Sequence, residues 1–598
     1  HYRKMNRFAI KTLALLFGSA AVAVMSQCAT AAPEQYYVKV AQLPAEATLD
    51  ERVDIASRTV PTANQLAWQD LELTAFLHFG INTFTDREWG DGKEDPALFN
   101  PTELDAEQWV KTLKDAGFKL VILTAKHHDG FCLWPTQTTD HSVASSPWKD
   151  GKGDVVKELR DACDKYGMKL GIYLSPWDRN SPKYGDSEAY NDQFVAQLTE
   201  LLTNYGKIDE VWFDGACGEG PNGKKQEYDW NRFRQVMEQL QPEAVLAITG
   251  DDVRWVGNEG GVGRETEWSV TPLMPSIFPE SASYNDSLGI NAMAKNIGDR
   301  EMLAKAKEVR WWPSEVDVSI RPGWFYHDSQ QPKSLAKMAD IYLSSVGRNS
   351  VLLLNIPPDR RGLIADADVA RLKEFRKWVD DNFSNDLVAS ADSATMSAAL
   401  NPQSKINTVV LSEDISKGQR VEKFVVEALT DGAWKPVTEG TTIGKKRILV
   451  MDDDIVADSL RVNIVSTRNT PHVRPVKAYY VIMPDNLAAR ETEFDVIGKS
   501  TVDGSALVCD AGSDTKIAGF IYSPAKDEKP IFKYVAETSN DGAKWQRVQT
   551  VGEFGNIFNN PIPQRVVFSS PVNARWIRIV STDDEPKASG KLEILKVK

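Results

Sequence analysis

Two of the seven histidines of this chain stand side by side, as His127 and His128, in the segment 126–131. They follow the apolar run 120–123, whose composition is typical of a fully buried strand. A third histidine, His78, ends another apolar run at 75–77. Any one of them alone is explained as well by packing in a core. Because the carboxyl ends of parallel strands hold ligands in α/β folds, three at strand ends indicate a binding site.

A carboxylate occupies a similar position at Asp214, directly after the apolar run 211–213 and before Gly215. A side chain placed there projects into the mouth of a barrel, although a helix cap or an arginine partner would also explain it. Tyr173 ends the strand-like run 169–174. We expect Asp214 and Tyr173 to converge with the histidines on one rim.

A carboxylate nucleophile needs a second carboxyl group to protonate the leaving oxygen, roughly 5–5.5 Å away in retaining glycosidases. The run 244–248 leads into a polar loop, 251–268, that offers Glu259 on a glycine-rich turn. Glu265 and Glu267 are rivals in the same loop. Spacing alone does not choose among the three.

Alternating strands and amphipathic helices must position these residues. This pattern favours a TIM-like (β/α) barrel within an α/β fold over a doubly wound sheet. Strand-like runs lie at 73–79, 119–124, 169–174, 210–213, 244–248, 308–312 and 351–355. Helical periodicity marks 105–116, 155–166, 189–205, 230–240, 335–346 and 368–383.

The helical periodicity stops near residue 385, and short strands separated by polar turns follow. Such spacing is typical of β-sandwiches. We therefore predict a barrel at 33–384, a first β-sandwich at 385–488 and a second at 489–598. A chain of 598 residues is too long for a single hydrophobic core, which agrees with several domains.

Residues 1–32 have the order of a secretory signal, with basic residues, an apolar run and then small residues. The apolar run is too short for a comfortable membrane span. Cys28 lies just past it and is a candidate for a lipid anchor, although the residues before it match a lipoprotein site poorly. We expect an exported protein that is periplasmic or associated with the cell envelope.

The composition excludes several classes of function. With 84 acidic against 70 basic residues and no basic block, nucleic acid is not the expected partner. The five cysteines form no C-x-x-C pair, so a zinc site is not expected. We also expect no other metal site and no cofactor. The 17 tryptophans favour a carbohydrate ligand, because indole faces stack on sugar rings, although core packing explains many of them.

Four motifs, at 78–80, 126–131, 173–177 and 212–215, together resemble the pattern of the alpha-L-fucosidases of glycoside hydrolase family 29. The resemblance covers about 65–380 and implies a retaining hydrolase with a catalytic barrel. It further implies that Asp214 is the nucleophile. The residues that it assigns to fucose binding are His78, His127, His128 and Tyr173, with Glu88 and Trp89 from the loop 88–91.

The acid/base position follows from a narrower resemblance. The segments 257–259, 315–317 and 321–324 are similar to the subgroup that acts on α-1,3/1,4-linked fucose. This resemblance favours Glu259 as the acid/base, with Glu267 second. Trp312 and Trp324 are candidates for stacking on the sugar, and core packing is the equal alternative. The segments 537–542 and 574–579 resemble a discoidin or coagulation-factor-type C module.

The expected function is a retaining exo-alpha-L-fucosidase that releases terminal fucose through a fucosyl-enzyme intermediate. Its partner would be a fucosylated oligosaccharide or glycoconjugate glycan. One alternative is a retaining glycosidase for another sugar. The other is a non-catalytic glycan-binding protein of the envelope, against which the presence of both Asp214 and Glu259 counts.

Overall fold

The computed structural model describes residues 34–290, 294–484, 494–554, 557 and 563–598. The predicted signal segment 1–32 and its Cys28 lie outside these residues. Within the described ranges, no helix combines the length and the apolar composition that a membrane crossing requires.

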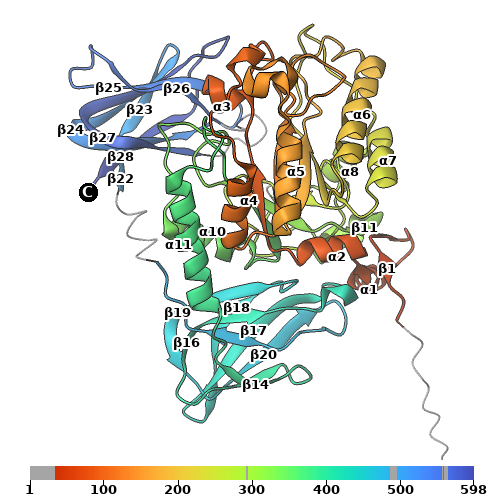
Figure 1. Cartoon of the computed structure of the whole chain (residues 1–598). Helices are drawn as coiled ribbons and strands as arrows, with labels where there is room; N and C mark the ends of the chain where they lie inside the picture. The colour runs from red at the N-terminus through yellow and green to blue at the C-terminus, as the bar shows by residue number, and fades with distance from the viewer. Residues whose placement is uncertain (1–33, 291–293, 485–493, 555–556, 558–562) are drawn as a thin grey trace, which may run out of the picture. The chain divides into compact units, whose positions relative to one another are not determined.

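Eight parallel strands form a nearly closed barrel, which confirms the predicted fold class (Figure 1). The order around the sheet is β8-β7-β6-β5-β4-β13-β12-β9, and a single bridge between Ala247 and Val253 joins the two ends. The strands are β4 (Leu73–Leu77), β5 (Leu120–Lys126), β6 (Lys169–Leu174), β7 (Glu210–Phe213), β8 (Val245–Ile248), β9 (Arg254–Trp255), β12 (Ser314–Ser319) and β13 (Ser350–Asn355).

Both faces of the barrel strands are buried, and this explains their continuous apolar sequences. In β5 every residue is buried. Leu120 and Ile122 point into the barrel, where they join Phe76 and Tyr173 in one apolar cluster. Val121 and Leu123, one residue out of step, belong to the cluster that packs against the surrounding helices.

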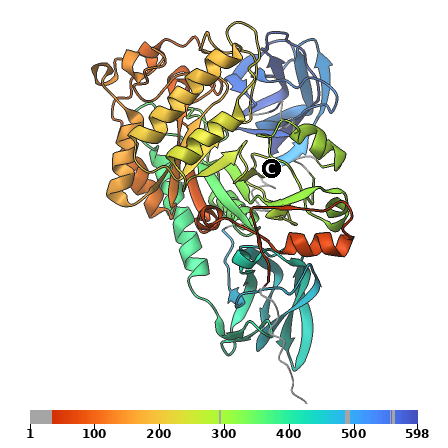
Figure 2. The ribbon, with the colours of Figure 1, turned by 90° about the vertical axis from the view of Figure 1, so that its right-hand side faces the viewer.

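Helices cover the outside of the barrel where the periodicity predicted them. In α5 (Val155–Tyr166), Asp154 caps the first turn by accepting from Lys157 N, and Gly167 ends the helix at φ 67°. Figure 2 shows α6 and α7 side by side in yellow. The other helices are α1 (Leu49–Ser57), α2 (Ala63–Gln69), α3 (Ile81–Thr85), α4 (Ala106–Asp115), α6 (Ser187–Asn204), α7 (Trp230–Leu240), α8 (Ser281–Ser287), α9 (Arg300–Lys305), α10 (Leu335–Ser345) and α11 (Asp366–Phe383), with 3-10 turns η1 (Pro96–Leu98), η2 (Val143–Ser145), η3 (Trp148–Gly151) and η4 (Ile415–Lys417).

One predicted barrel strand is wrong. The run 308–312 forms β11 (Glu308–Trp311), which pairs antiparallel with β2 (Val40–Gln42) and β10 (Val270–Thr271) in a separate sheet. The barrel position belongs instead to β12, whose sequence Ser-Glu-Val-Asp-Val-Ser alternates polar and apolar residues. Its carboxyl groups face the interior, so it lacks the apolar run that marks strands such as β4, β5 and β13. A further short parallel pair joins β1 (Tyr37–Val38) to β3 (Thr59–Val60).

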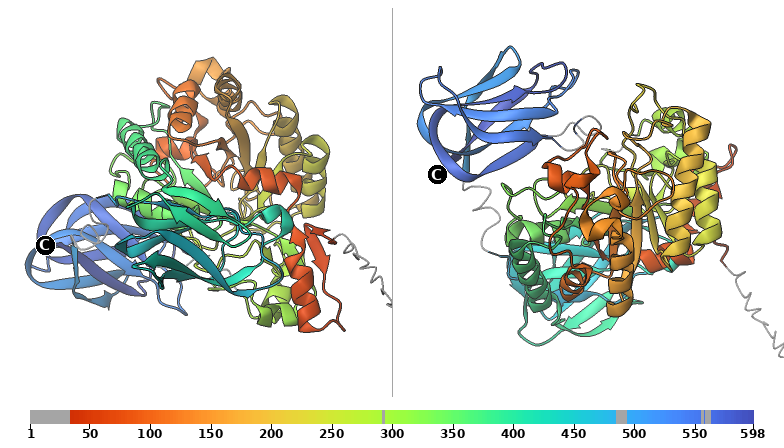
Figure 3. Two further views of the ribbon diagram at one scale, coloured as in Figure 1. Left: turned by 90° about the horizontal axis from the view of Figure 1, so that it is seen from below. Right: turned by 45° about the horizontal axis from the view of Figure 1, so that its top comes forward.

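Antiparallel sheets make up most of the described residues after α11, as predicted. Two sheets enclose one apolar core and consist of β14 (Val388–Asp392), β15 (Ser397–Leu400), β16 (Lys405–Leu411), β17 (Val421–Thr430), β18 (Ala433–Gly440), β19 (Arg447–Val456), β20 (Ser459–Thr467) and β21 (Lys477–Tyr479). The C-terminal strands, blue in Figure 3, have a core of their own and are β22 (Phe494–Ile497), β23 (Lys499–Asp503), β24 (Ala506–Ser523), β25 (Lys533–Ser539), β26 (Gln546–Glu553), β27 (Gln564–Ser581) and β28 (Lys591–Val597).

Candidate active site

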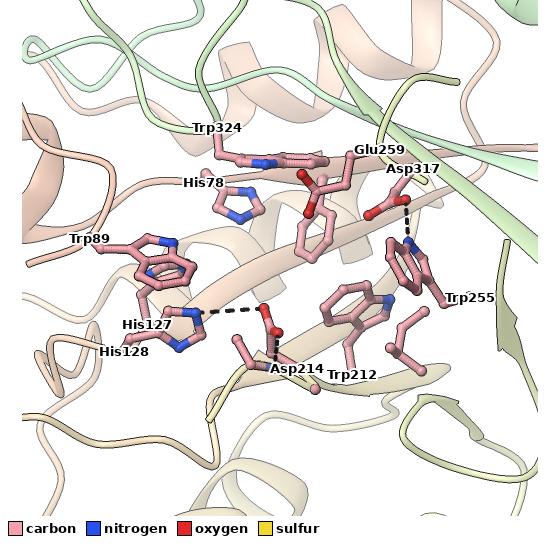
Figure 4. A pocket seen from close by; sticks show the side chains of 14 residues that line it. His78, Trp89, His127, His128, Trp212, Asp214, Trp255, Glu259, Asp317 and Trp324 are labelled. Carbon is pink, nitrogen blue, oxygen red and sulfur yellow. Dashed lines mark hydrogen bonds and ion pairs between the residues drawn. The ribbon is translucent and has the colours of Figure 1, made fainter. Parts of the chain in front are cut away.

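A pocket of about 200 Å³ opens at the carboxyl ends of the barrel strands (Figure 4). The strands deliver its polar side chains in the predicted way: His78 follows β4, His127 and His128 follow β5, and Asp214 follows β7. Aromatic side chains form much of the remaining wall. The full lining is Phe76, His78, Trp89, His127, His128, Trp212, Asp214, Gly215, Ala216, Ile248, Trp255, Glu259, Asp317 and Trp324.

Neighbouring groups fix the orientation of the Asp214 carboxylate. Its Oδ2 accepts a hydrogen bond from the Tyr173 hydroxyl at 2.8 Å, and its Oδ1 accepts one from Ala216 N at 2.8 Å. The Nε2 of His128 lies 3.8 Å from Oδ2. The side chain keeps 25% of its surface exposed, so it remains accessible from the pocket. Tyr173 itself is fully buried and contacts the carboxylate rather than lining the pocket.

Hydrogen bonds also determine which nitrogens of the histidines can meet a ligand. Asn355 Nδ2 donates to Ser319 and Trp324 O, so its Oδ1 is the atom that accepts from His78 Nδ1 at 2.9 Å. Ser175 donates its hydroxyl proton to Trp177 O and can therefore only accept from His128 Nδ1 at 2.7 Å.

Both imidazoles consequently carry their proton on Nδ1 when they are neutral, which leaves Nε2 as an acceptor. Burial lowers the pKa of His78 and of His128 to about 4, and it lowers the pKa of His127 well below the ordinary value. At neutral pH these side chains are uncharged. They suit a ligand that donates hydroxyl protons, and they are not cations that would bind a phosphate or carboxylate.

The three candidate glutamates have different surroundings. Glu259 lines the pocket, and Figure 4 shows it across the cavity from Asp214. Glu265 instead forms ion pairs with Arg348 and Arg447. Glu267 is 1% exposed and pairs with Arg254 and Arg264. Only Glu259 of the three is among the pocket residues.

Besides Tyr173, two residues predicted to bind the ligand, Glu88 and Trp312, lie outside the pocket lining. Glu88 turns its carboxylate to the backbone N–H groups of Trp324 and Phe325, so it supports the segment that carries Trp324. The indole N–H of Trp312 donates to Gly250 O at 3.2 Å, and the ring packs in an apolar cluster with β11. Trp312 is thus a core residue, the alternative that its sequence left open.

The predicted Trp89 and Trp324 do line the pocket. The Trp324 ring lies 5.1 Å from the His78 ring, with an angle of 37° between their planes. Trp89 meets the His128 ring edge-on at 5.3 Å. The two indoles thus place apolar surface next to the polar His78 and His128 side chains.

Sequence reasoning missed three pocket residues that carry polar groups, Trp212, Trp255 and Asp317. The indole of Trp255 donates to Asp317 Oδ1 at 2.9 Å. Burial raises the pKa of Asp317 to about 8, so this carboxyl group is protonated at neutral pH. Trp212 stands on β7, two residues before Asp214, and this spacing could have indicated from the sequence that it lies near the pocket. Asp317 lies on β12, the strand that the apolar pattern did not reveal.

Comparison with known proteins agrees with this geometry. The sequence model of the alpha-L-fucosidase family matches residues 58–384, and that of the F5/8 type C domain matches residues 486–594. Alpha-L-fucosidase 1 of Arabidopsis thaliana is 40% identical over 70% of this chain and 87% of its own length.

Two solved structures extend the likeness. A Bacteroides ovatus protein is 56% identical, with a TM-score of 0.73 over 94% of this chain and 100% of that one. A family 29 fucosidase of Ruminococcus gnavus, solved in complex with fucose, is 31% identical, with a TM-score of 0.61 over 71% of this chain and 95% of that one. The chain therefore belongs to the alpha-L-fucosidase family, glycoside hydrolase family 29.

Proposed function

We propose that this alpha-L-fucosidase releases terminal fucose with retention of anomeric configuration, through a covalent fucosyl-enzyme intermediate. Asp214 attacks the anomeric carbon while Glu259, protonated, gives its proton to the leaving oxygen. The same carboxylate then activates the water that hydrolyses the intermediate. The observation that carries the assignment is that these two carboxyl groups line one pocket, whereas Glu265 and Glu267 are paired with arginines.

The sugar site fits a ligand with several hydroxyl groups and an apolar edge. Nε2 of His78 and Nε2 of His128 accept hydroxyl protons, and the faces of Trp324 and Trp89 cover carbon-bound hydrogens. Fucose has this character, because its sixth carbon is a methyl group. The fucose complex of the Ruminococcus gnavus relative supports the same ligand.

For the linkage, we infer α-1,3/1,4-linked fucose on a branched oligosaccharide or glycoconjugate. The inference depends on the subgroup resemblance at 257–259, 315–317 and 321–324. The segment 1–32 leads us to place the enzyme outside the cytoplasm, in the periplasm or envelope.

Azide rescue tests the two catalytic roles with a single reagent. On an aryl α-fucoside, Glu259→Ala should still form the intermediate, because a phenolate leaves without a proton, and azide should then yield the α-fucosyl azide. Asp214→Ala should instead yield the inverted β-fucosyl azide, because azide replaces the nucleophile directly. Proton NMR identifies both products.

The same azide product from both variants would refute the assignment of roles. Linkage is tested separately, by NMR of the products from defined α-1,2-, α-1,3- and α-1,4-fucosylated oligosaccharides. Equal rates on all three would contradict the subgroup inference. Faster turnover of another aryl glycoside in a matched panel would contradict fucose as the substrate.

A further inference from the structure

Three carboxyl groups inside the barrel accept hydrogen bonds from tryptophan indoles. Glu210 accepts from Trp68 at 3.0 Å, and Glu315 accepts from Trp212 at 2.7 Å. Asp317 accepts from Trp255, as described above. Glu210 and Glu315 are fully buried. In the part of the chain that the structure describes, no lysine, arginine or histidine forms an ion pair with Glu210 or Glu315.

The carboxyl groups of Glu210 and Glu315 also interact with each other. Glu210 Oε1 and Glu315 Oε2 are buried, and within the described residues neither accepts a hydrogen bond from an N–H or hydroxyl group. Burial raises the pKa of Glu210 to about 7. Burial and the adjacent Glu210 raise the pKa of Glu315 well above its ordinary value. Two carboxylates in contact without a cation cannot both ionise, so one proton must lie between them.

The indole held by this pair belongs to the sugar pocket. Trp212 lines the pocket, and its ring stacks on that of Tyr173 at 5.4 Å with 23° between the planes. Tyr173 in turn donates to the Asp214 carboxylate. A continuous series of contacts thus leads from the barrel core to the nucleophile.

We propose that Glu210 and Glu315 form an acid dyad that shares one proton, and that Glu315 is a positioning residue which fixes Trp212 in the wall of the sugar pocket. The shared proton gives each carboxyl a defined role. One group donates to the other, and the oxygens that remain accept the two indole N–H groups. A buried lysine or arginine would also neutralise the negative charge of the pair. Its N–H groups, however, would compete with the Trp212 indole for the Glu315 oxygen.

The inference rests on the proposed sugar pocket, so its test has one arm that needs no substrate. Infrared difference spectra between the wild type and Glu315→Gln, recorded in D₂O at neutral pH, should show the C=O stretch of a protonated carboxyl group that the variant changes. Absence of any such band would overturn the shared proton, whether or not the enzyme cleaves fucosides.

Kinetics with an aryl α-fucoside form the second arm. Glu315→Gln should keep kcat/KM within about threefold, because the amide oxygen accepts from Trp212 and the amide N–H donates to Glu210. Glu315→Leu removes the acceptor at similar volume. We expect KM to rise about tenfold in this variant, more than kcat falls, which corresponds to the loss of one buried hydrogen bond.

A mutant cycle separates positioning from a general loss of structure. Trp212→Phe keeps an aromatic ring but has no N–H group, so in this background Glu315→Leu should raise KM only about twofold. A tenfold rise that persists in this background would overturn the proposal that Glu315 acts through Trp212. Equal losses for Glu315→Gln and Glu315→Leu would overturn the hydrogen-bonding role itself. If Glu315→Leu does not fold, the infrared arm decides.

Discussion

Replacement of Asp317 by asparagine should stabilise the protein in a way that grows with pH. The amide is an uncharged analogue of the protonated carboxyl group, and its oxygen can still accept from Trp255. In the unfolded chain an aspartate ionises near pH 3.8, whereas burial raises the pKa of Asp317 to about 8 in the folded protein. Between these values folding must therefore take up a proton.

The direction and the size of this pH dependence follow from the linkage between proton binding and folding. Because the folded state binds one proton more than the unfolded state, wild-type stability decreases by about 1.4 kcal/mol per pH unit across this window. From pH 3.8 to 8 the interval is 4.2 units, which sets an upper bound of about 6 kcal/mol. Asp317→Asn lacks this dependence. It should match the wild type near pH 4 and exceed it increasingly up to pH 8, with no further gain above that.

Calorimetric melting of the barrel transition at pH 5, 6, 7 and 8 measures the difference. Asp453→Asn, which removes an exposed carboxyl group from β19, is the matched control for loss of one acidic residue. A difference between Asp317→Asn and the wild type that stays constant with pH would refute a protonated Asp317. So would a variant that becomes less stable than the wild type as pH rises.

Three further predictions concern neighbouring residues. Tyr173→Phe removes the 2.8 Å hydrogen bond to the Asp214 carboxylate and should lower kcat/KM about tenfold, measured on an aryl fucoside, with an unchanged melting temperature. Burial alone would lower the pKa of His327, but hydrogen bonding led by Asp86 raises it to about 10. The contribution of His327 to the free energy of unfolding should thus be complete below about pH 6.5 and disappear as the pH approaches 10. Denaturant titrations of the wild type and of His327→Gln across that range measure this contribution. Glu267→Ala leaves its buried arginine partners without a counter-charge and should lower the free energy of unfolding, measured in urea, by about 3–5 kcal/mol. An unchanged stability, together with a loss of activity that azide restores, would indicate a catalytic role instead.

The sequence revealed the polar strand ends because a local signal encodes them. An apolar run followed by His78, His127 or Asp214 indicates a buried strand and its exit, and a barrel gathers such exits at one rim. The same signal failed for β12, since its inward carboxyl groups interrupt the apolar run. The run 308–312 took its place in the prediction because of its apolar residues Val309, Trp311 and Trp312, although Glu308 and Arg310 alternate with them.

The surroundings of the three candidate glutamates depend partly on residues far away in the chain. Glu265 pairs with Arg348 and Arg447, which lie outside the loop. Glu267 pairs with Arg254 and Arg264, which lie within it. Glu259, by contrast, lines the pocket.

By itself, the sequence determined the alternation of strands and helices, the residues at the strand ends and the family to which they belong. All of these follow from periodicity and from motifs a few residues long. Only the tertiary structure decided that Trp312 packs in a core, that Trp255 enters the pocket, and that burial raises the pKa of Asp317. The physical reason is that burial and the dielectric around a carboxyl group depend on which strands become neighbours, and this depends on the closure of the whole barrel.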